Sequence, residues 1–160
     1  MFNVVRTFHF LFCVETAFLA CIHLLALLTM VVFLSSEAAL CCTEWMNAAV
    51  VKRLARLDMI FGIAAVAVLA TGLMRVFLGA KGASWYVSQP LFHLKMALFI
   101  TGALLSFKPT VVFRRWLRQL RDNGSLPAAA EVLSTRKWIM WQAHLIPVIA
   151  AVAVFYARGW

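Results

Sequence analysis

The fold is decided by the stretch TAFLACIHLLALLTMVVFL, residues Thr16–Leu34, which carries no formal charge. About 20 consecutive apolar residues in a helix span the hydrocarbon core of a bilayer. Because a backbone in lipid must satisfy its own hydrogen bonds, such a stretch is expected to be helical. It is also longer than the apolar region of a cleavable signal peptide. We therefore interpret it as a membrane-spanning helix that begins near residue 14.

Three further apolar stretches follow, and together they predict an all-α, single-domain bundle of four transmembrane helices. The expected spans cover residues 14–34, 59–78, 90–107 and 138–157. Composition supports this prediction, because 64% of the 160 residues are hydrophobic and soluble domains average roughly 45–50%. A soluble domain of this length could not hide so much apolar surface from water.

The basic residues predict the orientation. The link 108–137 holds Lys108, Arg114, Arg115, Arg118, Arg121, Arg136 and Lys137. The link 35–58 holds Lys52, Arg53 and Arg56, whereas the Gly-rich loop 79–89 holds only Lys81. By the positive-inside rule both longer links are cytoplasmic, which puts both termini on the periplasmic side of a bacterial inner membrane. The link 35–58 is expected to form an amphipathic helix or an extension of the first span.

The charge balance also indicates which classes of partner the protein can bind. The chain has 15 Lys and Arg against 6 Asp and Glu, but the cations lie between apolar stretches. This placement indicates the lipid bilayer and its anionic headgroups rather than nucleic acid. Helix faces rich in small residues favour close association, so a homodimer is an open alternative.

Polar side chains inside the spans are the main functional candidates, because burying them in a membrane is costly. His23 lies on one helix face with Ala20, Ala26 and Met30, which indicates contact with another helix. An imidazole there is a candidate axial haem ligand, metal ligand or proton relay. A structural hydrogen bond to a neighbouring helix is the alternative.

Lys95 shares a face with Gly102 and Ser106, so we expect it to point into the bundle and to pair with Glu15. His93 is two residues earlier, about 200° around the helix, and should point largely away. His144 lies at a depth within roughly 10 Å of His23. A haem or metal held between these two histidines is therefore a hypothesis, with His93 as the alternative second ligand.

Two further polar positions are predicted at the ends of the second span. Asp58 shares a face with Gly62, Ala65 and Gly72, so it should point inward and pair with Arg56 or with a cation of the link 108–137. Arg75, with Lys81 and Lys95, would form a basic cluster at the outer surface. Headgroups, haem propionates or an anionic substrate would suit this cluster.

The enzyme motifs that a sequence can reveal are absent. The chain has no P-loop, GxGxxG, GxSxG or HExxH pattern, and no C-x-x-C. No catalytic residue is therefore assigned, and whether the protein is an enzyme stays open.

The order of these features resembles a family of small bacterial membrane proteins known as domain-of-unknown-function 2214. The family pattern, in the numbering of this chain, corresponds to His23, Glu37, Arg53–Asp58 (RLARLD), Gly72–Gly82 (GLMRVFLGAKG), Pro109-Thr110 and Ile146-Pro147 to Gly159. The resemblance runs from about residue 15 onward and implies a four-helix membrane bundle with no settled activity. The chain departs from it in an N-terminal extension with Arg6, His9 and Glu15, and in His93, where an aromatic residue is expected.

A looser likeness leads to the functional hypotheses. HemJ-type protoporphyrinogen oxidases carry a first-helix His and a later H-x-K, similar to His23 and His93-Leu94-Lys95, and CopD-type copper proteins are comparable bundles. The likeness implies a redox-linked protein that binds haem b. One alternative is a metal or small-solute transporter using His23, Cys21 and Met30, although Cys21 lies about 200° from His23. Another is a non-catalytic membrane partner that docks through its basic link.

Overall fold

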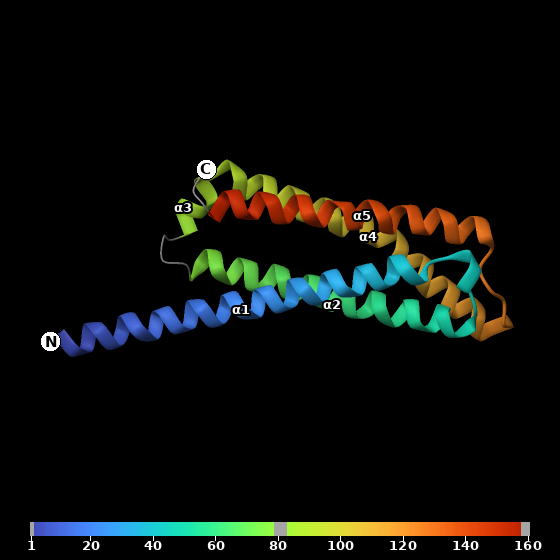
Figure 1. The fold of residues 1–160 in the computed structure, drawn as a ribbon, viewed down its shortest axis with the longest axis horizontal. Coiled ribbons are helices and arrows are strands. Elements are labelled where there is room, and N and C mark those ends of the chain that lie inside the picture. The colour runs from blue at the N-terminus through green and yellow to red at the C-terminus, as the bar shows by residue number, and fades with distance from the viewer. Residues whose placement is uncertain (1, 79–82, 158–160) are drawn as a thin grey trace.

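The computed structural model describes residues 2–78 and 83–157, and these form long helices joined by short connections (Figure 1). The helices are α1 (Phe2–Leu40), α2 (Ala48–Phe77), α3 (Ala83–Ser88), α4 (Pro90–Asn123) and α5 (Ala129–Ala157), with a short 3-10 helix η1 (Thr43–Trp45) after α1. Four of them, α1, α2, α4 and α5, are long and apolar enough to cross a membrane. The predicted all-α bundle of four spanning helices is confirmed.

The helices extend beyond the predicted spans at one end of the bundle. α1 continues to Leu40 and α2 begins at Ala48, so most of the expected link 35–58 is helical. α4 likewise continues through its basic residues to Asn123, and α5 begins at Ala129. The predicted spans ended where charged residues become frequent, whereas Arg, Lys, Glu and Ala favour helix outside the bilayer as well.

Local sequence explains where these helices stop and start. The side chain of Asn47 accepts hydrogen bonds from the backbone N–H groups of Ala49 and Val50, which caps α2. Pro90 occupies the first turn of α4, where no N–H is needed. Gly124 ends α4 with φ 68°, a left-handed conformation that favours glycine.

The bundle consists of two helix pairs. α1 packs chiefly against α2, and α4 chiefly against α5, with smaller contacts between the pairs (Figure 1). We call the end with the connections 41–47 and 124–128 the loop end. The opposite end, with α3 and both chain termini, is the terminal end. In Figure 1 the two pairs lie close together towards the loop end and apart at the terminal end.

The buried core lies in the half of the bundle nearer the loop end. The largest fully buried side chains there come from all four spanning helices and include Leu34, Leu54, Phe113, Trp116 and Ile139. Towards the terminal end, large apolar side chains such as Phe18, Leu25 and Phe77 are exposed. A membrane protein exposes such side chains to lipid at no cost, so the outer surface suits a bilayer.

Candidate functional site

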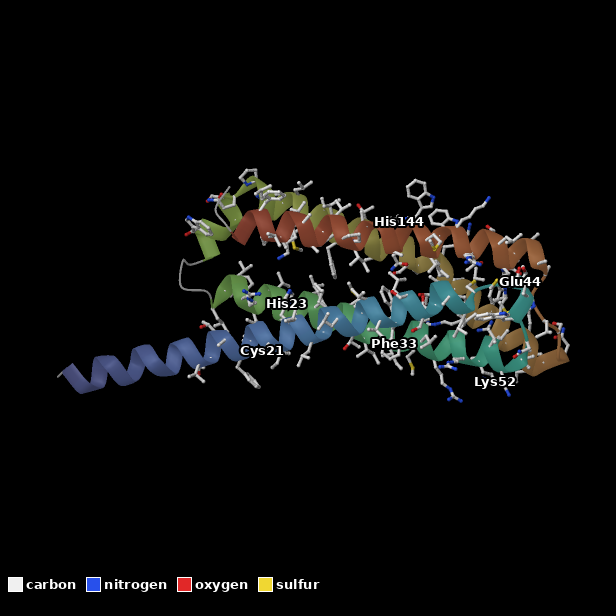
Figure 2. The ribbon with its side chains drawn as sticks, in the orientation of Figure 1. Cys21, His23, Phe33, Glu44, Lys52 and His144 are labelled. Atoms are coloured by element: carbon white, nitrogen blue, oxygen red, sulfur yellow. The ribbon has the colours of Figure 1, made fainter. Side chains whose placement is uncertain are left out.

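His23 lies between α1 and α2 in the terminal half of the bundle (Figure 2). Its Nδ1 is 2.8 Å from the hydroxyl oxygen of Thr71, which also donates to the carbonyl of Ala67. A Cβ placed on Gly72 would lie 3.3 Å from the Cε1 of His23. A glycine therefore leaves the room that the imidazole occupies, and the ring is held in place by the neighbouring helix.

The predicted basic cluster is placed only in part. Lys95 is half-buried on α4, Arg75 is exposed in the last turn of α2, and the charges of both act on the His23 imidazole. Lys81 lies outside the described residues. Glu15 is exposed on α1, and the ion pairs found in the described part of the chain do not include one between Glu15 and Lys95.

Of the other three histidines, His93 and His144 are exposed, and the side chain of His9 lies outside the described part of the chain. His93 lies on the surface of α4, with its Nε2 2.7 Å from the carbonyl oxygen of Val87 in α3. His144 lies on the surface of α5, with its Nδ1 2.6 Å from the carbonyl oxygen of Met140 in the same helix. Figure 2 shows His23 and His144 in different helix pairs, with His144 nearer the loop end. The structure does not bring the two rings face to face.

The soft ligands proposed for a metal site do not lie in the same environment either. Cys21 is exposed, whereas Met30 is buried in the core. Among the side chains that the structure describes, no three of His, Cys, Asp or Glu are grouped so that they could hold a metal ion. Among His23, His93 and His144, only His23 is directed inward, and no second metal ligand from this set lies with it.

A cavity of about 260 Å³ lies between α2, α4 and α5, with Met30 of α1 at its edge. Its walls are apolar or small, and include Phe61, Gly62, Ala65, Phe99, Gly102 and Ile149. Val66, which also lines it, is 67% exposed on the outside of the bundle. The cavity therefore opens sideways, towards the surface that a bilayer would cover.

Three polar side chains line this cavity. Ser106 and Thr110 come from α4, and Gln142 comes from α5. The Ser106 hydroxyl donates to the carbonyl of Ala103, so it is satisfied within its own helix. Gln142 is only 4% exposed, and its amide makes no hydrogen bond with any residue in the described ranges. Its amide atoms are not among the fully buried polar atoms without a partner, so they are open to the cavity and can hydrogen-bond to whatever occupies it.

Thr110 connects the cavity to Asp58. The Thr110 hydroxyl donates to the Oδ1 of Asp58 across 2.6 Å, and Asp58 is only 6% exposed. Asp58 thus points inward, as the sequence predicted. The predicted ion pair is replaced by this hydroxyl contact, because Arg56 is exposed and Arg114 acts on Asp58 only through its charge.

Two functional candidates were missed by the sequence prediction. Glu37 was assigned to a polar link, but it is 2% exposed inside the bundle. Its spacing of seven from Met30 and fourteen from His23 places it on the inward face of α1, and this signal could have found it. Gln142 is uncharged and stands out only as an amide inside an apolar span.

The comparisons with known proteins agree with the fold. No curated protein and no solved structure matches the chain, so the likeness to HemJ-type and CopD-type proteins stays a prediction. A family model described as "Predicted membrane protein (DUF2214)" matches residues 15–160. This match covers nearly the whole chain and all four spanning helices. The chain therefore belongs to the DUF2214 family of predicted membrane proteins.

Proposed function

We propose that this protein binds a small, mainly apolar molecule within the membrane, in the cavity between α2, α4 and α5. The observation that carries the proposal is the Gln142 amide, which has no hydrogen bond to the described residues and faces a cavity whose wall is apolar apart from Ser106 and Thr110. Binding sites for small molecules are lined mostly by apolar side chains, with a few polar groups that orient the ligand. This site differs from that of the predicted metal or small-solute transporter, because His23 and Cys21 do not line the cavity.

The size and the walls of the cavity limit the chemistry of the ligand. A volume of about 260 Å³ is near the lower end of the roughly 300–1,000 Å³ range of ligand pockets. The ligand would have an apolar body against Phe61 and Phe99, and one end group that hydrogen-bonds to Gln142 and Thr110. Because the cavity opens beside Val66, such a molecule would enter from the bilayer.

Native mass spectrometry of the protein, released from its own membrane, tests this proposal. We expect a bound small molecule in the wild type and its loss in Ala103→Leu, which adds bulk to the cavity wall. Ala97→Leu is the matched control, because Ala97 is exposed on the same helix but does not line the cavity. Equal occupancy in both variants, or no bound molecule in the wild type, would contradict the proposal.

A second candidate is haem b ligated by His23, and the contact of its Nδ1 with Thr71 favours it, because a Thr71 hydroxyl that donates to Ala67 can accept from Nδ1–H. A partner on Nδ1 fixes the ring and leaves Nε2 as the nitrogen for a metal, as is usual for histidine ligands. Lys95 and Arg75 would meet the propionates. The fit is partial, because the residues lining the cavity include no histidine and His144 faces outward. His23 would be a single axial ligand.

The absorption spectrum of protein expressed with sufficient haem tests this candidate. We expect a Soret band that is lost in His23→Ala and retained in His144→Ala. A colourless wild-type protein, or a band that survives His23→Ala, would exclude His23 as the ligand.

The loop end is proposed to face the cytoplasm and its anionic headgroups. Its exposed cations include Lys52, Arg56 and Arg121, which line a groove of about 570 Å³ between α2 and α4. The apolar floor of this groove, with Met59 and Leu117, would suit the start of an acyl chain. The contribution of these cations to headgroup binding is measured by comparing wild type with Arg56→Glu. Each protein is tested for binding to vesicles with and without phosphatidylglycerol.

A further inference from the structure

Two carboxyl groups are buried together where the helix pairs meet. Glu37 of α1 is 2% exposed and Asp58 of α2 is 6% exposed. The two helices pack against each other, and the charge of Asp58 acts on Glu37. Glu37 lies between the fully buried Leu34 and Cys41, and Asp58 lies between the buried Leu54 and Phe61. Both carboxyls are therefore inside the packed half of the bundle, away from water.

Few groups in the described part of the chain can stabilise a negative charge on Glu37 or Asp58. Asp58 accepts one hydrogen bond from Thr110, whereas the Oε1 of Glu37 is buried without a partner. The ion pair found among the described residues joins Arg115 to Glu131 and involves neither carboxyl. The positive charges that act in this region are those of Arg114 on α4, which acts on Asp58, and Arg136 on α5, which acts on Cys41 beside Glu37.

Physical chemistry limits how such a pair can be charged. An ionised carboxylate taken out of water without a cation costs several kcal/mol, and the group usually takes up a proton instead. Two coupled carboxylates raise that cost further, so their protons bind as a property of the pair. We propose that Glu37 and Asp58 form a shared proton-binding site, and that Thr110 transmits its protonation state to the cavity.

Thr110 can transmit this state because it has one hydrogen to donate. When Asp58 is ionised, the Thr110 hydroxyl must donate to it and offers only an acceptor oxygen to the cavity. When Asp58 takes a proton from bulk water, the carboxylic acid can donate to Thr110, and the hydroxyl hydrogen becomes free for a ligand. This second step rests on the proposed function and makes ligand binding depend on pH.

The proton site is tested on the wild-type protein in nanodiscs with N,N′-dicyclohexylcarbodiimide, an apolar reagent that modifies protonated carboxyl groups. Peptide mapping by mass spectrometry locates the modified residue. We expect modification at Glu37 or Asp58 at neutral pH, falling at least tenfold as the pH is raised. Glu131, which is paired with Arg115, is the internal control and should stay unmodified.

Two outcomes would overturn the proton site. Modification of neither Glu37 nor Asp58 at any pH would show that neither carries an accessible proton. Protection by Na⁺ at constant pH would show a cation site instead. Infrared spectroscopy gives an independent readout, since the carbonyl band of a buried carboxylic acid should be present in wild type and reduced in Glu37→Gln.

The link to the cavity is tested by native mass spectrometry at several pH values. We expect occupancy to change with pH in wild type and to become independent of pH in Asp58→Asn, whose amide can donate to Thr110 permanently. Unchanged pH dependence in this variant would refute the role of Thr110. If the wild type binds no molecule, the proposed cavity function fails and so does this link, whereas the carbodiimide result on the carboxyl pair still stands.

Discussion

The two halves of this bundle use similar apolar residues in different ways. In the loop half, side chains from all four spanning helices are buried against one another, and Trp116 and Phe113 pack ring against ring with centroids 5.5 Å apart. In the terminal half, residues such as Phe18, Leu25 and Phe155 are exposed, as lipid permits. Hydropathy therefore predicts the membrane but not the core. The tightly packed side chains, and the polar groups enclosed among them, lie in the half of the bundle where the two helix pairs meet.

The largest expected effect is on packing in the loop half. Trp116 is 1% exposed, so Trp116→Ala should lower the free energy of unfolding by about 3–5 kcal/mol, the usual range for a buried aromatic residue. Trp141 is 72% exposed, and Trp141→Ala should change the free energy of unfolding by less than about 0.5 kcal/mol. Unfolding in mixed micelles measures both, and equal losses would show that burial in the core does not decide how much a tryptophan stabilises the bundle.

Thiol reactivity measures how well the loop half excludes water. Burial raises the pKa of Cys41 to about 12 from an ordinary value of 9.0, whereas its neighbour Cys42 is half-buried. Because the thiolate is the reactive form, Cys41 should react with a maleimide at least about 1,000-fold more slowly than Cys42. Single-cysteine variants at pH 8 test this difference, and similar rates would refute the closed packing.

The same thiols test orientation and pH dependence. An impermeant maleimide should reach Cys42 only from the cytoplasmic side if the loop end faces inward.

The thiol of Cys41 ionises near 9.0 in the unfolded protein and near 12 in the folded protein. As the pH rises, the unfolded state therefore loses this proton first. The stability contributed by Cys41 should therefore be complete below pH 9 and fall as pH rises towards 12. Cys41→Ala should remove that slope.

The contact of Gly72 with His23 measures packing in the terminal half. Gly62→Ala meets nothing within 4 Å and should stabilise the helix by about 0.5–1 kcal/mol. Gly72→Ala should gain less or lose stability, because its methyl group meets the imidazole at 3.3 Å. Adding His23→Ala should restore the gain. If Gly72→Ala stabilises the protein as much as Gly62→Ala does while His23 is present, the imidazole does not lie against Gly72.

The smallest expected effect is at the surface. Arg115 of α4 and Glu131 of α5 form an ion pair near the loop end, with the Arg115 side chain 54% exposed. Exposed ion pairs contribute between about 0 and 1 kcal/mol, so Glu131→Gln should cost less than 1 kcal/mol and less still at high salt. Asp122→Asn, at an exposed carboxylate of the same region, is the control. A loss as large as that of Trp116→Ala would contradict the view that packing stabilises this half.

Particular residues show what sequence could and could not predict. The four spans followed from hydropathy, and the 100° step per residue predicted that Lys95 would be more buried than His93 and that Asp58 would point inward. A helical extension of the first span beyond Leu34 was predicted, whereas the helix beyond Phe107 was missed because span length was taken as helix length. Gln142 and the Asp58–Thr110 contact depend on residues from different helices, 52 positions apart for the latter, and no local pattern specifies such a meeting.

The short connections 41–47 and 124–128 have a consequence for the order of assembly. Each joins neighbouring antiparallel helices, so the chain consists of two hairpins, α1–α2 and α4–α5. We expect each hairpin to insert into the membrane on its own, since its main contacts are between sequence neighbours. The Thr110–Asp58 bond crosses from one hairpin to the other. The interior polar site would therefore come into existence only when the hairpins meet, as the last event in folding.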